Sequence, residues 1–261
     1  MVYDSRRLDK LRQGYEKAAE FYDLFASNED LPFYLDYAER KGSPILDLAA
    51  GAGRVSIELA KQGYQVMAVE KSIPMINQFR KNLKSLKSKI SNKITLVQAD
   101  MTNFVSGDEF SLAIIPASFG HAMTTDEQLA ILRNVHSSLQ SDGFFILDLF
   151  PGGLQPEYST FSEPPKELPD GKTVTRSGVM KADPVTQILE LELKYTVREK
   201  SGDVVQEIVQ ESGAALVYNR EANLLLRLTD FEVVDEYGDF EYSPYTTESA
   251  RRILVTKKKI T

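Results

Sequence analysis

The stretch Ile45-Leu46-Asp47-Leu48-Ala49-Ala50-Gly51-Ala52-Gly53-Arg54 decides the fold of this 261-residue chain. Its first residues predict a short buried strand, and the small residues that follow predict a tight turn that opens a helix. Small residues let the backbone approach a ligand closely, and a helix N-terminus presents unpaired N–H groups and a partial positive charge. The stretch therefore indicates a binding site for a carboxylate or a phosphate.

Short apolar runs recur along the chain, and helical or polar segments separate most of them. The runs are rich in Ile, Leu and Val, which is typical of parallel strands covered on both faces. Two later segments predict strands that close the same sheet. The sequence thus predicts an α/β fold with a doubly wound, mainly parallel, seven-stranded sheet, its strands at 44–48, 65–70, 94–99, 110–115, 143–150, 231–237 and 253–257.

The segments around these strands predict helices. Two helices, at 15–26 and 31–40, are expected before the first strand, and Met75, Phe79, Leu83 and Leu86 follow helical spacing after the second. A capping box, either Thr124 with Glu127 or Thr125 with Gln128, predicts the start of another helix. Asn219 is the expected N-cap of the last one.

The sequence pattern of the chain changes after residue 150. A Pro/Gly-rich link leads into alternating apolar and charged residues at 189–198, which predict an antiparallel strand, and 200–203 reads as the turn of a hairpin. We expect a cofactor-binding core with N-terminal helices at 1–150, and a small antiparallel β insertion at 151–217 that walls the substrate pocket or contacts another subunit. Residues 218–261 would return to the core.

Acidic residues stand at the ends of the first three predicted strands. Asp47 belongs to the first, Glu70 ends the second, and Asp100 with Met101 follows the third. Open α/β sheets bind ligands at the carboxyl ends of their strands, where an acid about 20 residues after the turn binds the ribose of a nucleotide. The three acids predict a nucleoside-containing cofactor at this edge.

At these residues the chain resembles the class I S-adenosylmethionine-dependent methyltransferases, from about Tyr15 to the C-terminus. The family's acid-x-Gly-x-Gly-x-Gly turn reads here as Asp47 to Gly53, with Ala49 in place of the first glycine. The resemblance implies S-adenosylmethionine as cofactor, a Rossmann-like fold and an antiparallel last strand. It also implies a set of cofactor-binding residues: Tyr15, Tyr22, Asp47, Ala49, Gly51, Gly53, Glu70, Lys71, Met75, Asp100, Met101 and Pro116.

The loop after the fourth strand, 116–121, is the expected place for substrate contacts. It lacks the Asn/Asp-Pro-Pro-Tyr/Phe signature of relatives that methylate amides and adenine amino groups. His121 is either a base that accepts a proton from an amine or hydroxyl, or a residue that caps a helix or binds backbone. The second interpretation is favoured because loop histidines commonly serve as hydrogen-bonding groups. The whole pattern is similar to small-molecule methyltransferases, among them amino-sugar N-methyltransferases.

Composition narrows the possible partners and chemistry. The net charge of −7 argues against a nucleic-acid partner, because such proteins usually carry a basic face. The absence of cysteine excludes disulfides, thiolate nucleophiles and Cys-ligated metals, and no metal cluster is expected. No apolar run approaches the length of a spanning helix, so we expect a cytoplasmic enzyme without a membrane partner, a homodimer being one option.

Two other functions remain open at this point. A nucleotide-dependent oxidoreductase uses the same kind of sheet, but it normally shows Gly-x-Gly-x-x-Gly, and Ser56 occupies the third position here. A non-catalytic protein that binds S-adenosylmethionine would keep the same three acids. We therefore predict transfer of a methyl group to nitrogen or oxygen of a small molecule by direct displacement, with these two as alternatives.

Overall fold

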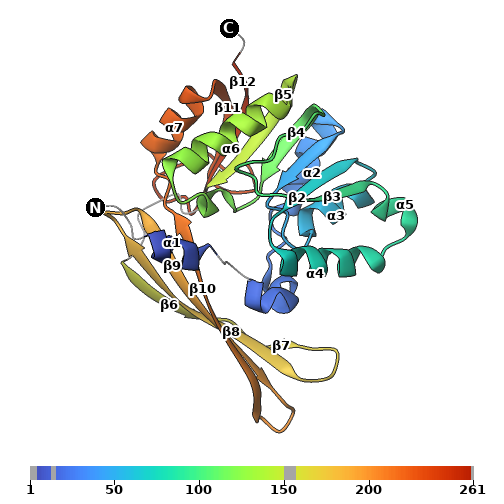
Figure 1. The fold of residues 1–261 in the computed structure, drawn as a ribbon, viewed down its shortest axis with the longest axis vertical. Helices are drawn as coiled ribbons and strands as arrows, with labels where there is room; N and C mark the ends of the chain where they lie inside the picture. The colour runs from blue at the N-terminus through green and yellow to red at the C-terminus, as the bar shows by residue number, and fades with distance from the viewer. Residues whose placement is uncertain (1–4, 13–15, 150–156, 260–261) are drawn as a thin grey trace. The chain divides into compact units, whose positions relative to one another are not determined.

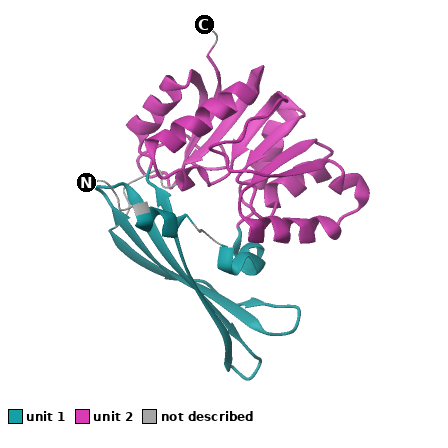
Figure 2. Ribbon diagram, in the orientation of Figure 1, with its two compact units in different colours: residues 1–26, 155–216 teal, residues 27–154, 217–261 magenta. Residues whose placement is uncertain are grey.

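The structure is a computed structural model that describes residues 5–12, 16–149 and 157–259. It divides into two compact units, shown in different colours in Figure 2. One unit comprises residues 27–154 and 217–261, and the other comprises residues 1–26 and 155–216. The expected division placed residues 1–26 with the core, whereas here they belong to the unit of the insertion.

The larger unit contains a seven-stranded sheet in the order β11-β12-β5-β4-β1-β2-β3 (Figure 1). The pairs among β1 to β5 are parallel, whereas β12 is antiparallel to both of its neighbours. This confirms the predicted fold class. The strands are β1 Ile45–Leu48, β2 Val66–Glu70, β3 Ile94–Gln98, β4 Phe110–Ile115, β5 Leu139–Leu149, β11 Phe231–Tyr237 and β12 Arg252–Lys258.

Helices cover both faces of this sheet because its central strands are apolar on both sides. Ile146 of β5 packs in one core with Tyr34 of α2 and Val55 of α3. Its neighbour Phe145 points to the opposite face and packs against Phe231 of β11. The helices of this unit are α2 Leu31–Lys41, α3 Arg54–Lys61, α4 Ile73–Lys84, α5 Ser88–Ser91, η2 Phe119–His121, α6 Thr125–Ser138 and α7 Asn219–Leu228.

The smaller unit is a separate antiparallel sheet in the order β10-β9-β8-β6, with β7 paired to β8 (Figure 1). The predicted hairpin at 200–203 is confirmed, since β9 and β10 flank it in antiparallel register. The elements of the smaller unit are α1 Ser5–Leu11, η1 Glu16–Phe25, β6 Tyr158–Ser162, β7 Lys166–Glu167, β8 Thr173–Asp183, β9 Ile188–Arg198 and β10 Val204–Ala215.

Several local predictions need correction. The segment expected as a helix from residue 15 is a 3-10 helix, η1, that is kinked at Ala18. Tyr218, and not Asn219, is the N-cap of α7, which begins at Asn219. The capping box of α6 is Thr124 with Glu127, the first of the two options. Across the described residues, no helix is both long enough and apolar enough to cross a bilayer.

Candidate functional site

The turn after β1 has a left-handed backbone at three positions. Ala49, Gly51 and Gly53 have φ angles of 55°, 58° and 89°. Glycine adopts this region without cost, but a residue with a Cβ atom is strained there by about 1–2 kcal/mol. A Cβ atom on Gly53 would also lie 2.1 Å from Cε2 of Phe79 in α4. The turn therefore needs glycine at position 53 for packing and carries strain at Ala49.

Glu70 holds this turn from the end of β2. The Gly51 N–H donates to its Oε2 at 2.9 Å, and the Ser72 N–H donates to its Oε1 at 2.7 Å. Ser72 is in turn the N-cap of α4, where its hydroxyl accepts from the Met75 N–H. Each carboxylate oxygen can accept a further hydrogen bond. Glu70 thus ties two strand ends together and retains capacity for a ligand.

Asp47 lies in β1 with one oxygen bonded and the other free of partners. The Ser56 hydroxyl donates to its Oδ2 at 2.5 Å, whereas its Oδ1 is buried without a hydrogen bond. Burial raises the pKa of Asp47 to about 7, although the Ser56 bond and the nearby Arg54 charge act in the opposite direction. A buried carboxylate oxygen without a partner is costly, and a ligand donor would relieve that cost.

Asp100 follows β3 and is half-exposed. Its Oδ1 accepts from the Thr102 N–H at 2.9 Å and from the Thr102 hydroxyl at 2.8 Å. The exposed Lys71 ammonium lies 3.6 Å from its Oδ2. Partial burial raises the pKa of Asp100, but the Thr102 bonds and the Lys71 charge outweigh it, so that the pKa is lowered. Asp100 is an ionised acceptor at neutral pH.

The remaining predicted residues are distributed over both units. Met75 and Met101 are buried, and Pro116 opens the loop after β4, where His121 is half-buried in η2. Tyr22 lies in η1 of the smaller unit. Tyr15 lies outside the described residues. The predicted site residues that follow β1, β2, β3 and β4 lie at the carboxyl edge of the sheet, because parallel strands end at the same edge.

The sequence analysis missed a buried ionic group at this edge. Asp148 of β5 is 2% exposed, and its two oxygens each lie 3.2 Å from one guanidinium nitrogen of Arg251. Asp30, before α2, forms two hydrogen bonds of 2.5 and 2.6 Å with Arg54. The available signal was an acid inside an apolar run, since Ile146-Leu147-Asp148-Leu149 has the same pattern as the stretch that contains Asp47.

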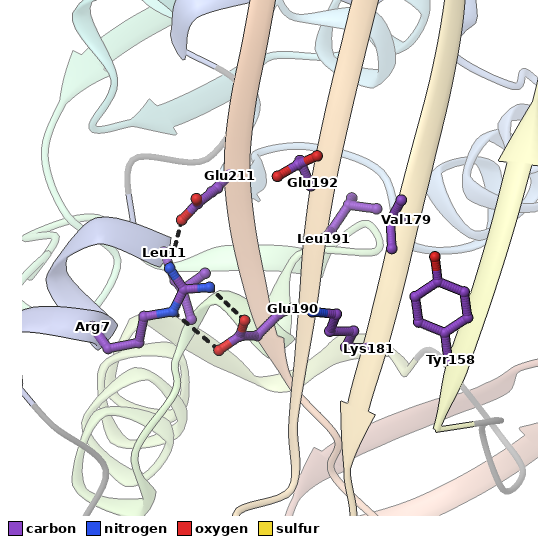
Figure 3. A pocket seen from close by; sticks show the side chains of 9 residues that line it. All are labelled: Arg7, Leu11, Tyr158, Val179, Lys181, Glu190, Leu191, Glu192 and Glu211. Atoms are coloured by element: carbon purple, nitrogen blue, oxygen red, sulfur yellow. Dashed lines mark hydrogen bonds and ion pairs between the residues drawn. The ribbon is translucent and has the colours of Figure 1, made fainter.

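The smaller unit contains a pocket of its own with a volume of about 190 Å³ (Figure 3). Arg7 of α1 lies over it and bonds both Glu190 of β9 and Glu211 of β10, at 2.5 and 2.6 Å. Lys181 and Tyr158 line it from β8 and β6. No pattern in the sequence indicated this cluster, because Arg7 in α1 lies 183 positions before Glu190 and 204 before Glu211.

The strand order and the edge of acids define the class of protein. Rossmann-like methyltransferases have a seven-stranded sheet with an antiparallel strand between β5 and β11, a glycine turn after β1, and acids in β1, at the end of β2 and after β3, as found here. The residues fit S-adenosylmethionine. The free Oδ1 of Asp47 would accept from its ammonium group, and Glu70 and Asp100 present acceptors for ribose hydroxyls and an adenine amino group.

Comparison with known proteins agrees with this class. Residues 45–143 match the family described as "Methyltransferase domain". The chain is 23% identical to "Cypemycin N-terminal methyltransferase" of Streptomyces sp, over 94% of this chain and 97% of that protein. It superimposes on the CcbJ methyltransferase of Streptomyces caelestis with a TM-score of 0.79, at 21% identity and coverages of 99% and 100%.

A third relative was solved with its cofactor. The structure of S-adenosylmethionine-bound CalS10, described as an amino pentose methyltransferase from Micromonospora echinaspora, gives a TM-score of 0.68 at 16% identity, with coverages of 99% and 98%. The predicted resemblance is confirmed: residues 45–143 carry a methyltransferase domain.

Proposed function

We propose that this protein transfers the methyl group of S-adenosylmethionine to an amine nitrogen of a small molecule. The observation that carries the proposal is the set of three acids at one sheet edge, with Glu70 fixed by the Gly51 and Ser72 amides and one Asp47 oxygen left free. The choice of nitrogen is supported by relatives named as an N-terminal methyltransferase, an amino pentose methyltransferase and a sugar N-methyltransferase.

Each residue of the edge has a distinct role in this proposal. Asp47 binds the ammonium group of the cofactor, Glu70 the ribose hydroxyls and Asp100 the adenine amino group, while Met75 and Met101 contact the adenosine and Lys71 flanks it. Ala49, Gly51, Gly53 and Pro116 bring backbone close to the cofactor. When bound, S-adenosylmethionine supplies an electrophilic methyl group on a sulfonium. The main task of the protein is then to align acceptor and methyl group and to exclude water.

An amine attacks only through its neutral lone pair, so a proton must leave the acceptor nitrogen. His121 in η2 is the imidazole on the loop after β4 and is proposed to take this proton. Its backbone N–H donates to the Ser118 carbonyl at 3.0 Å, which fixes the loop locally.

The cofactor assignment is tested by calorimetric titration with S-adenosylmethionine, S-adenosylhomocysteine and NAD. Micromolar binding of the first two that is weakened in Glu70→Ala and Asp100→Ala supports the proposal, whereas binding of NAD alone refutes it. Asp108→Ala is the matched control, because Asp108 is an exposed acid on the loop between β3 and β4.

The acceptor is tested with a panel of amines, alcohols and carboxylates and with RNA. Methylation confined to amines is the expected result; methylation of alcohols or RNA would redirect the assignment. A cytoplasmic location and a homodimer are further proposals, which cell fractionation and light scattering test. The acidic net charge of −7 supports a small molecule over nucleic acid as acceptor.

A further inference from the structure

The loop after β4 is held at both ends by buried side chains from other elements. At its start, the Ala117 N–H donates to Oδ2 of Asp148 at 3.1 Å. At its end, Nε2 of Gln128 in α6 donates to the Ala122 carbonyl at 2.9 Å. Asp148 and Gln128 are both 2% exposed. The loop between them carries Pro116 and His121, so its conformation is imposed from outside it.

Ala117 needs this support because its backbone is left-handed, with a φ of 47°. A residue with a Cβ atom disfavours this region, so the turn is strained unless its surroundings hold it. The side chain of Ala117 is exposed and contributes no core packing. Within the turn, the Ser118 hydroxyl donates to the Pro116 carbonyl at 2.8 Å. The Ala117 N–H donates outside the turn, to Asp148.

Asp148 is itself fixed by its neighbours on the sheet. The parallel register pairs Ile115 of β4 with Leu147 of β5, which places Asp148 beside the first residue of the loop. On its other side, Arg251 lies just before β12 and donates to both carboxylate oxygens. The Arg251 guanidinium also packs 5.1 Å from the centre of the Phe240 ring. The carboxylate is therefore paired, oriented and removed from water.

We propose that Asp148 is a positioning residue for methyl transfer: held by Arg251, its carboxylate fixes the Ala117 N–H and thereby sets the loop that carries Pro116 and His121. This inference rests on the proposed function. It assigns no contact with substrate or cofactor to Asp148. The carboxylate acts through the backbone of the loop, and a displacement of about 1 Å at reacting groups costs roughly 100-fold in rate.

The test compares variants that remove the carboxylate or the cation that holds it. Asp148→Ala removes the acceptor, and Arg251→Met removes the cation that orients this carboxylate while leaving the loop sequence unchanged. Asp148→Asn keeps an oxygen for the Ala117 N–H and serves as the conservative rescue. Thr256→Val is the matched control, since it removes a buried hydrogen bond from β12 to the Phe145 carbonyl of β5, away from the loop.

Three readings are taken on the full chain: amide exchange of residues 116–122, affinity for S-adenosylhomocysteine, and kcat and KM for the best amine of the panel. For Asp148→Ala and Arg251→Met we expect exchange at least tenfold faster and kcat about 100-fold lower. The loss of cofactor affinity should be smaller than the loss of kcat, because Pro116 is only one of several proposed cofactor contacts. Asp148→Asn should recover most of kcat, and Thr256→Val should retain it.

Unchanged exchange in both Asp148→Ala and Arg251→Met would overturn the inference. So would a loss of cofactor affinity that matches the loss of kcat, or an equal loss of kcat in Thr256→Val at equal stability. If the wild type methylates no amine, the proposed function fails, and the exchange of residues 116–122 alone then decides whether Asp148 sets the loop. If Asp148→Ala does not fold, Arg251→Met carries the same comparison.

Discussion

The carboxylates at the edge of the α/β sheet and those on the antiparallel sheet differ in what surrounds them. Asp47 and Asp148 are buried, and burial raises the pKa of both. Glu211 is partly exposed, and bonds from Lys10 and Arg7 lower its pKa despite some desolvation. Burial disfavours the charged form, whereas a nearby cation favours it. The unpartnered oxygen of Asp47 therefore carries a burial cost that a ligand donor can relieve, whereas Asp148 and Glu211 already have cationic partners.

The largest expected effect is on the Asp148 and Arg251 pair. Arg251→Met leaves a carboxylate buried without its cation, which should lower the free energy of unfolding by about 3 kcal/mol. The double variant Asp148→Asn with Arg251→Met should be more stable than Arg251→Met alone, because it buries no unpaired charge. Urea denaturation of both variants measures this. Equal stabilities would mean that Arg251, whose side chain is 24% exposed, does not compensate the carboxylate.

The next effect concerns cofactor affinity. Glu70→Ala should weaken binding of S-adenosylhomocysteine about 100-fold, or about 2.8 kcal/mol. The variant loses the ligand contact and also releases the Gly51 and Ser72 amides that shape the turn. Calorimetry checks this against Asp108→Ala, which should bind like the wild type. A loss of less than threefold would show that Glu70 only supports the turn.

The third effect is a pH dependence that should occur in the α/β unit alone. With the Asp47 pKa at about 7, affinity for S-adenosylhomocysteine should rise about tenfold between pH 6 and pH 8, because only the ionised carboxylate accepts from the ammonium group. Asp47→Asn should abolish this rise. A wild-type affinity that is flat over this range would contradict the assignment of Asp47.

The raised pKa of Asp47 also predicts how the free energy of unfolding of the cofactor-free protein depends on pH. The folded protein holds a proton on Asp47 that the unfolded chain has already released above its ordinary pKa of 3.8. The contribution of Asp47 to the unfolding free energy is therefore fully present below about pH 4 and is lost as the pH rises to about 7. Thermal unfolding of wild type and Asp47→Asn should diverge over that range.

The smallest effect is expected on the antiparallel sheet. Arg7→Ala should lower the unfolding free energy by less than about 1 kcal/mol, because its guanidinium is 35% exposed and solvent screens the pairs with Glu190 and Glu211. The difference from wild type should shrink in 1 M salt. A larger or salt-independent loss would mean that these ion pairs contribute as much to stability as buried carboxylates do.

Much of the fold followed from the sequence because it depends on local pattern. Apolar runs fixed all seven strands of the α/β sheet to within a few residues, and the small residues after β1 fixed the turn. The three acids in β1, at the end of β2 and after β3 were also predicted to share one edge, since the carboxyl ends of parallel strands lie at the same edge of a sheet. The kink of η1 and the N-cap at Tyr218 did not, because a local pattern places a helix boundary only to within one or two residues.

The amino-acid sequence by itself determined the α/β class, the methyltransferase domain and the position of three acids at one edge of the sheet, since strand periodicity and turn chemistry are local properties. Only the tertiary structure decided which groups are buried and who their partners are. Asp148 meets Arg251 across 103 positions of the chain, and Arg7 meets Glu190 across 183. Pairing across such separations arises from strand order and register, which no local pattern encodes.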